Sequence, residues 1–158
     1  MNLLFDQIGL LLKTGDSREV TLLAVLDVVL AHFNSQTGTL HRLDADHQVL
    51  RLLAQKGLPP QLLEVVGTIP VGKGIAGQVA AQNRPVTMCN LQTDTSGVAK
   101  PGARQTGVGG ALCVPVRAGG TLVGTLGIGT SRAYEYTPAE TGLLEEIGRL
   151  LSPLCLPA

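Results

Sequence analysis

A glycine-rich stretch at residues 67–74, GTIPVGKG, is the first part of the sequence that suggests chemistry. It matches the start of a phosphate-binding loop, whose backbone N–H groups cradle phosphates while a lysine reaches them. Such a loop also needs a Ser or Thr after its lysine to hold magnesium, and here a glycine follows Lys73. Pro70 interrupts the stretch, and residues 61–66 before it have a helical pattern, where the loop needs a strand. We therefore expect no nucleotide site, and interpret the glycines as a tight turn into a helix.

Three cysteines and three histidines are the other candidates for chemistry: Cys89, Cys113, Cys155, His32, His41 and His47. The odd number of cysteines and the absence of a C-x-x-C motif argue against a disulfide framework and a zinc site. We therefore predict no metal and no cofactor. Free thiols fit a reducing compartment, so a cytoplasmic location is expected.

The composition limits the class of protein. With 44% hydrophobic and 15% charged residues in a chain of 158, a folded single domain is expected. Twelve basic residues balance twelve acidic ones and aromatic residues are scarce, so we predict no nucleic-acid binding. No apolar run reaches the roughly 18 residues that a membrane span needs, and the N-terminus resembles an amphipathic helix more than a signal peptide.

Hydrophobic spacing and turn residues predict five helices and five strands, in the order α-α-β-β-α-α-β-β-β-α. The second helix is predicted to be capped by Asp16, with Glu19 three residues on, and Thr137 with Glu140 forms a strong helix start. The helices are expected at about 2–13, 16–34, 60–66, 74–82 and from 138; the strands at about 37–55 (a hairpin turning at 44–46), 85–90, 111–118 and 121–130.

Strands joined by hairpins indicate an antiparallel sheet, with the terminal helices on one face, hence an α+β fold. Gly119 and Gly120 mark the last hairpin turn. The connection at 93–109 shows little periodicity, and long connections in compact domains are often functional. We expect it to form a roof over one face of the sheet.

Side chains alternate along strands 111–118 and 121–130, which gives this hairpin two unlike faces. One face is large and apolar and is expected to pack on the terminal helices: Leu112, Val114, Val116, Leu122, Leu126 and Ile128. The other is small, with a few polar groups: Ala111, Cys113, Pro115, Arg117, Thr121, Val123, Thr125, Gly127 and Gly129. A small face under a roof predicts a small-molecule pocket; the alternative is that side chains of the roof fill the space.

Residues outside this hairpin extend the predicted pocket. Thr39 and His41 share one face of the first strand, and Met88 approaches from the third. His41 is suited to a hydrogen bond with a ligand, although a structural histidine is the simpler interpretation. Lys100 and Arg104 in the roof suit an anionic ligand, with solvated surface charge as the alternative.

Three blocks of the sequence resemble the GAF domain family: IPVGKGIAGQVAAQNRPVTMCNLQTD, ALCVPVRAGGTLVGTLGI and YTPAETGLLEEIGRLL. They occur in the order and at the spacing usual for that family, and the resemblance runs from about Ser17 to Leu151. It implies an α/β/α sandwich with a six-stranded antiparallel sheet and a ligand pocket on the face away from the terminal helices. It also implies one domain over residues 1–158, with a core at about 17–151 and a helix at 1–13 in a homodimer interface.

The pattern of faces and the resemblance together predict ten ligand-binding residues and no catalytic ones. These ten are Thr39, His41, Ile75, Ala76, Met88, Ala111, Cys113, Thr125, Gly127 and Gly129.

Three functions are open. The first is a sensory domain that binds a small molecule or anion and signals through its terminal helices to a partner protein. The second is a degenerate module kept for dimerisation, without a ligand. The third is an enzyme similar to free methionine-R-sulfoxide reductases, which need a nucleophilic and a resolving thiol.

The residues that match the reductase motif argue against this third function. Ala76 stands where that motif has a cysteine, the roof carries none between Leu91 and Leu112, and Gly127 and Gly129 replace acidic residues. We therefore predict no enzyme. Motifs of GAF domains that bind cyclic nucleotides, bilins or haem are not visible either.

Overall fold

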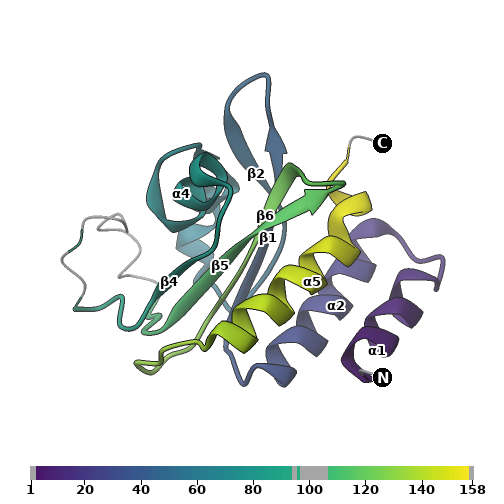
Figure 1. Ribbon diagram of the computed structural model, residues 1–158, viewed down its shortest axis with the longest axis horizontal. Coiled ribbons are helices and arrows are strands. Elements are labelled where there is room, and N and C mark those ends of the chain that lie inside the picture. Colours follow the sequence, from purple (N-terminus) through teal and green to yellow (C-terminus); the bar gives the residue numbers. More distant parts are fainter. Residues whose placement is uncertain (1–2, 94–95, 97–106, 157–158) are drawn as a thin grey trace.

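The computed structural model describes residues 3–93, 96 and 107–156. Within them, a six-stranded antiparallel sheet lies between two helical layers (Figure 1). The helices are α1 (Leu3–Leu12), α2 (Arg18–His32), the 3-10 turn η1 (Pro60–Leu62), α3 (Leu63–Gly67), α4 (Gly74–Gln82) and α5 (Pro138–Cys155). The strands are β1 (Thr37–Asp44), β2 (Val49–Lys56), β3 (Thr68–Pro70), β4 (Val86–Met88), β5 (Ala111–Ala118) and β6 (Thr121–Gly129), in the spatial order β3-β2-β1-β6-β5-β4.

The main core lies between the sheet and the layer formed by α1, α2 and α5. Figure 1 shows α5 and α2 side by side on the sheet, with α1 packed outside α2. The strands contribute Leu40, Leu112, Val114, Val116, Leu126 and Ile128, and the helices contribute Ile8, Leu22, Val25, Leu26, Leu144, Ile147 and Leu151. The prediction that the large apolar face packs on the terminal helices is therefore confirmed for five of its six residues, Leu112, Val114, Val116, Leu126 and Ile128.

The opposite face of the sheet is covered by α3 and α4 and by a smaller apolar cluster. Met88, Leu91, Val108 and Ala111 are buried in this cluster, and Ile75 of α4 packs against it. A side chain at Gly77 would place its Cβ 2.6 Å from the Pro70 carbonyl oxygen. Glycine at this position therefore allows α4 to sit directly on the turn that precedes it.

Strand β3 was not predicted from the sequence. It occupies residues 68–70 of the GTIPVGKG stretch and pairs with β2, with Leu50 opposite Ile69. A three-residue strand is defined by this distant pairing and leaves no local periodicity to detect. Pro70 is tolerated because β3 lies at the edge of the sheet.

Two further local predictions were wrong. Ser17, and not Asp16, caps α2, because the Ser17 hydroxyl accepts a hydrogen bond from the Val20 N–H. Arg117 and Leu122 were assigned to opposite faces, but a bulge after Val116 places them opposite each other in the β5–β6 ladder. An inserted residue reverses strict alternation beyond it, and the sequence alone does not mark its position. The predicted capping box of α5 is confirmed, with both hydrogen bonds between Thr137 and Glu140 present.

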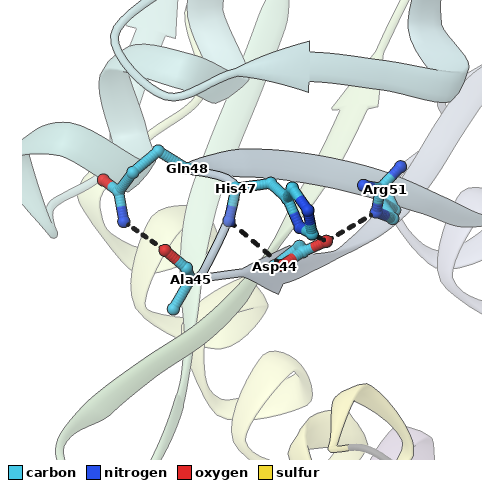
Figure 2. A network of polar contacts seen from close by, with 5 residues as sticks. All are labelled: Asp44, Ala45, His47, Gln48 and Arg51. Carbon is cyan, nitrogen blue, oxygen red and sulfur yellow. Dashed lines mark hydrogen bonds and ion pairs between the residues drawn. The ribbon is translucent and has the colours of Figure 1, made fainter.

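A network of polar contacts holds the β1–β2 hairpin, and Figure 2 shows the five residues that form it, of which Ala45 takes part through its backbone carbonyl. The Asp44 Oδ2 atom accepts hydrogen bonds from Arg51 Nε at 2.8 Å and from His47 Nδ1 at 2.9 Å. The Gln48 side chain donates to the Ala45 carbonyl at 2.7 Å. The hydrogen bond from Arg51, followed by those from His47, lowers the pKa of Asp44 from 3.8 to about 2.

This pKa shift predicts how the hairpin responds to acid. Because the pKa of Asp44 is lower in the folded than in the unfolded chain, its stabilising contribution is complete above about pH 5. The contribution is lost as the pH falls through about 4 to 2. We expect the difference in unfolding free energy between wild type and Asp44→Asn to shrink over that range, as measured by urea unfolding at a series of pH values.

Asp46→Asn is the matched control, since Asp46 lies in the same turn and its side chain has no ion pair among the described residues. A difference for Asp44→Asn that stays constant from pH 6 to about 2 would contradict the assignment.

Candidate functional site

A cavity of about 150 Å³ lies on the face of the sheet that α4 covers. Its floor is formed by β1, β5 and β6, and its wall by the start of α4 and the segments around Leu91 and Val108. The lining residues are Thr37, Gly38, Thr39, Ile75, Ala76, Leu91, Val108, Ala111, Leu112, Cys113, Gly127, Ile128 and Gly129. Seven of the ten residues predicted from the sequence are among them: Thr39, Ile75, Ala76, Ala111, Cys113, Gly127 and Gly129.

The floor of the cavity is low because β6 carries glycines where side chains would point into it. A Cβ at Gly129 would lie 2.7 Å from Thr37 Oγ1 and 2.8 Å from Val108 Cγ1. A Cβ at Gly127 would lie 3.1 Å from Thr39 Oγ1 and 3.7 Å from Cys113 Sγ. The space above these glycines is therefore bordered by two hydroxyls and a thiol, and otherwise by apolar groups.

Helix α4 brings backbone donors to the edge of the cavity. Ile75 and Ala76 lie in its first turn, and no side chain caps that turn at Lys73. The first N–H groups of a helix have no partner within the helix, and they carry the positive end of its dipole. This edge of the cavity therefore favours a hydrogen-bond acceptor or a negative charge.

Three of the predicted residues do not line the cavity. Met88 is buried in the small apolar cluster with Leu91 and Val108. His41 and Thr125 are buried in the sheet, 2% and 1% exposed. His41 Nε2 lies 2.8 Å from the Val66 carbonyl oxygen, so the segment that contains α3 covers this histidine.

Other lining residues were not predicted from the sequence, among them Thr37, Leu91 and Val108. Thr37 lies two residues before Thr39 in β1, so the alternation that selected Thr39 also identifies Thr37. Leu91 and Val108 come from segments with no regular pattern, and no local signal identifies them. Lys100 and Arg104, which were predicted in the roof, lie outside the described residues.

The cysteines differ sharply in their surroundings. Burial raises the pKa of Cys113, in the cavity floor, to about 12, although the Thr125 hydroxyl nearby acts in the opposite direction. Burial likewise raises the pKa of Cys155 to about 12. Cys89 is exposed. The Cys113 thiol is thus neutral at physiological pH and is a poor nucleophile.

The described residues provide neither a metal site nor a membrane-spanning helix. Within residues 3–93, 96 and 107–156, no group of three or more His, Cys, Asp or Glu side chains is placed to hold a metal ion. No helix in the same part of the chain combines the length and apolar character that crossing a membrane requires.

The family model of the GAF domain matches residues 15–153, which is most of the chain. The protein belongs to the GAF domain family. Members of this family are generally sensory or regulatory, and the six-stranded sheet between helical layers is the arrangement that the sequence resemblance implied.

Solved structures of other GAF proteins share this fold. The GAF domain of a phosphoenolpyruvate-protein phosphotransferase from Acinetobacter has a TM-score of 0.77 and 20% identity, covering 98% of this chain and 94% of that chain. The corresponding domain from Coxiella burnetii has a TM-score of 0.81 and 19% identity, covering 95% and 89%.

An enzyme is also among the similar structures. The free methionine-R-sulfoxide reductase from Neisseria meningitidis, in complex with its substrate, has a TM-score of 0.76 and 17% identity, covering 96% of this chain and 85% of that chain. A comparison with curated proteins finds no match. At these identities the structural likeness establishes the fold of this GAF domain and leaves its activity to be argued from its own residues.

The cysteine environments lead to a prediction about thiol reactivity. In the native protein at pH 8, Ellman's reagent is expected to react rapidly with Cys89 alone, because the other two thiols are buried with raised pKa values. In guanidinium chloride all three should react. Cys89→Ser is the control and should abolish the rapid phase. If a thiol of the native Cys89→Ser protein still reacted rapidly, Cys113 or Cys155 would be reactive and the prediction would be wrong.

Proposed function

We propose that this GAF domain is a sensory or regulatory domain that binds a small molecule in the sheet-face cavity and signals through its terminal helices. The observation that carries the proposal is the cavity floor. Gly127 and Gly129 leave space on the face of the sheet opposite the terminal helices, and the start of α4 forms part of its wall. A concave, mostly apolar site with a few polar groups is the usual form of a ligand pocket.

The size and lining of the cavity limit the ligand. An apolar cavity of about 150 Å³ is large enough to hold a molecule the size of benzene. The hydroxyls of Thr37 and Thr39 and the N–H groups at the start of α4 offer polar contacts at its border. The ligand is therefore a small molecule or small anion with an apolar body and an acceptor group that faces Ile75 and Ala76.

We propose that this ligand is bound and released unchanged. Reductase chemistry needs a reactive thiolate, and Cys113 is the one cysteine among the described residues that line the cavity. Its raised pKa and the alanine at position 76 both argue against a nucleophile there. Three free thiols also fit the proposed cytoplasmic location.

Arg117 supplies a direct connection between the helix over the cavity and a terminal helix. Its guanidinium donates to both oxygens of Asn83, the residue that ends α4: Nε to Oδ1 at 2.9 Å and Nη2 to the carbonyl at 2.6 Å. The same guanidinium donates from Nη1 to Glu145 Oε2 of α5 at 3.1 Å. In this proposal, a ligand that moves the start of α4 also shifts its end and, through Arg117, moves α5.

Exposed apolar residues support self-association through the helical layer. Leu3 and Leu10 are 80% and 69% exposed and lie two turns apart on α1, and Val20 at the start of α2 is 53% exposed. Leucines this exposed are suited to a partner surface. We propose that this layer contacts a second copy of the chain or a partner protein. Sedimentation equilibrium of the chain measures its molar mass in solution and so tests the homodimer.

The binding proposal is tested by a thermal-shift screen of the wild type and of Gly127→Leu. The probes are small anions, 2-oxo acids, amino acids, methionine sulfoxide and cyclic nucleotides. A ligand at a hundredfold its dissociation constant adds roughly 2.7 kcal/mol, which for this chain length raises Tm by roughly 5–11 °C. Gly127→Leu should fold, since the backbone at Gly127 is not left-handed, but should lose the shift because its side chain fills the cavity.

Gly142→Leu is the matched control, because a side chain there would meet nothing within 4 Å. An unchanged shift in Gly127→Leu would place the ligand elsewhere. If no probe stabilises the wild type and mass spectrometry finds nothing bound, the ligand-free dimerisation module is favoured. Stabilisation by methionine sulfoxide, followed by turnover, would favour the enzyme.

The connection through Arg117 predicts an effect on two helices at once. In Arg117→Gln, hydrogen exchange should accelerate by about fivefold both at the end of α4 and in the middle of α5, because one guanidinium stabilises both. In the control Arg149→Gln, which removes an ion pair with Glu146 inside α5, exchange in α4 should not change. If hydrogen exchange accelerated in α5 alone after Arg117→Gln, the proposed connection between the two helices would be wrong.

A further inference from the structure

Two buried polar atoms without partners lie next to each other in the sheet. His41 Nδ1 and Thr125 Oγ1 are both inaccessible to solvent and form no hydrogen bond of ordinary geometry among the described residues, although the Thr125 hydroxyl lies close enough to the Cys113 thiol to oppose the rise in that thiol's pKa. The two residues are directly opposite each other in the β1–β6 ladder, so their side chains share one face. Leaving such atoms unsatisfied is costly, and native proteins usually satisfy them with protein or water.

The hydrogen-bonding needs of the two atoms are complementary. The Val66 carbonyl can only accept, so the His41 Nε2 atom 2.8 Å away carries the proton and Nδ1 presents a lone pair. Burial lowers the pKa of His41, although the hydrogen bond to Val66 acts in the opposite direction, so the ring is neutral at physiological pH. Nδ1 therefore requires a donor, whereas the Thr125 hydroxyl can both donate and accept.

The pair lies beside the cavity. Thr39 and Gly127, which line the cavity, are the next residues on this face, since Thr39 is paired with Gly127 and His41 with Thr125. Successive residues on one face of a strand are about 7 Å apart. Because Gly127 has no side chain, no side chain of that residue stands between the cavity and the His41–Thr125 pair.

We propose that His41 and Thr125 form a subsite for one uncharged donor group, an O–H or N–H, which donates to His41 Nδ1 and accepts from or donates to Thr125. Two sources supply this chemistry: a buried water, or the polar end of the ligand that the cavity holds. Only the second source rests on the proposed function. A carboxylate or phosphate does not suit the subsite, because it cannot donate to a neutral imidazole.

The sign of one stability change tests the subsite without any ligand. If a donor group bridges the pair, Thr125→Val removes one of its partners, and Tm should fall by about 2–6 °C. If the pair is empty, Thr125→Val replaces an unsatisfied hydroxyl by a methyl group of the same shape, and Tm should stay or rise. Thr87→Val, at an exposed position of β4, measures the effect of the same substitution where water is available.

Nitrogen NMR of the full chain provides a second, direct measurement. The His41 Nδ1 signal of the wild type should be shifted upfield of a free acceptor nitrogen, and the shift should diminish in Thr125→Val. A wild-type Nδ1 signal at the position of a free acceptor, or a Tm that rises in Thr125→Val, would overturn the proposal. Both measurements keep their meaning if the cavity binds nothing, so they are independent of the proposed function.

Titration with propan-1-ol and with propionate distinguishes the two sources, since the two molecules share a carbon chain and only the alcohol can donate. If propan-1-ol moves the His41 Nδ1 signal in the wild type but not in Gly127→Leu, a ligand group enters the subsite from the cavity. If propan-1-ol leaves that signal unchanged, the donor is a resident water. If propionate moves the signal at pH 7, the requirement for a donor is wrong.

Discussion

The difference in side-chain volume between the two faces of the central strands is the constraint on which this structure depends. On one face, branched side chains of β5 and β6 interlock with α2 and α5 and form the main core. Burial of such side chains is the largest favourable contribution to folding. On the other face, glycine, alanine and threonine cannot fill the space under α4, so the same strands that build the core also leave a cavity.

Much of this arrangement could be predicted from the sequence, since it depends on local signals. Helix α4 and strand β5 have the predicted bounds, and the capping box of α5 is present as expected. Both residues of the Gly119–Gly120 turn have positive φ, which is the conformation that favours glycine there. These features are encoded by neighbouring residues, whose spacing and turn chemistry are visible without a structure.

The features that could not be predicted depend on residues far apart in the sequence. Strand β3 exists because it pairs with β2, and the bulge near Arg117 is set by the register of two strands. In the same way, alternation placed His41 and Thr125 on the correct face, but only the segment above them shows that they are covered. Sequence patterns thus identified the face of the sheet and most of the cavity floor, whereas its wall and its depth follow from packing.

The short strands at both margins of the sheet limit how this protein associates. Strands β3 and β4 have three residues each, and β3 ends in Pro70. A margin this short offers few unpaired backbone groups to a strand from another molecule, and proline cannot donate at all. Growth of the sheet from chain to chain, which is the route to fibrous aggregates, is thereby disfavoured even when the protein is concentrated.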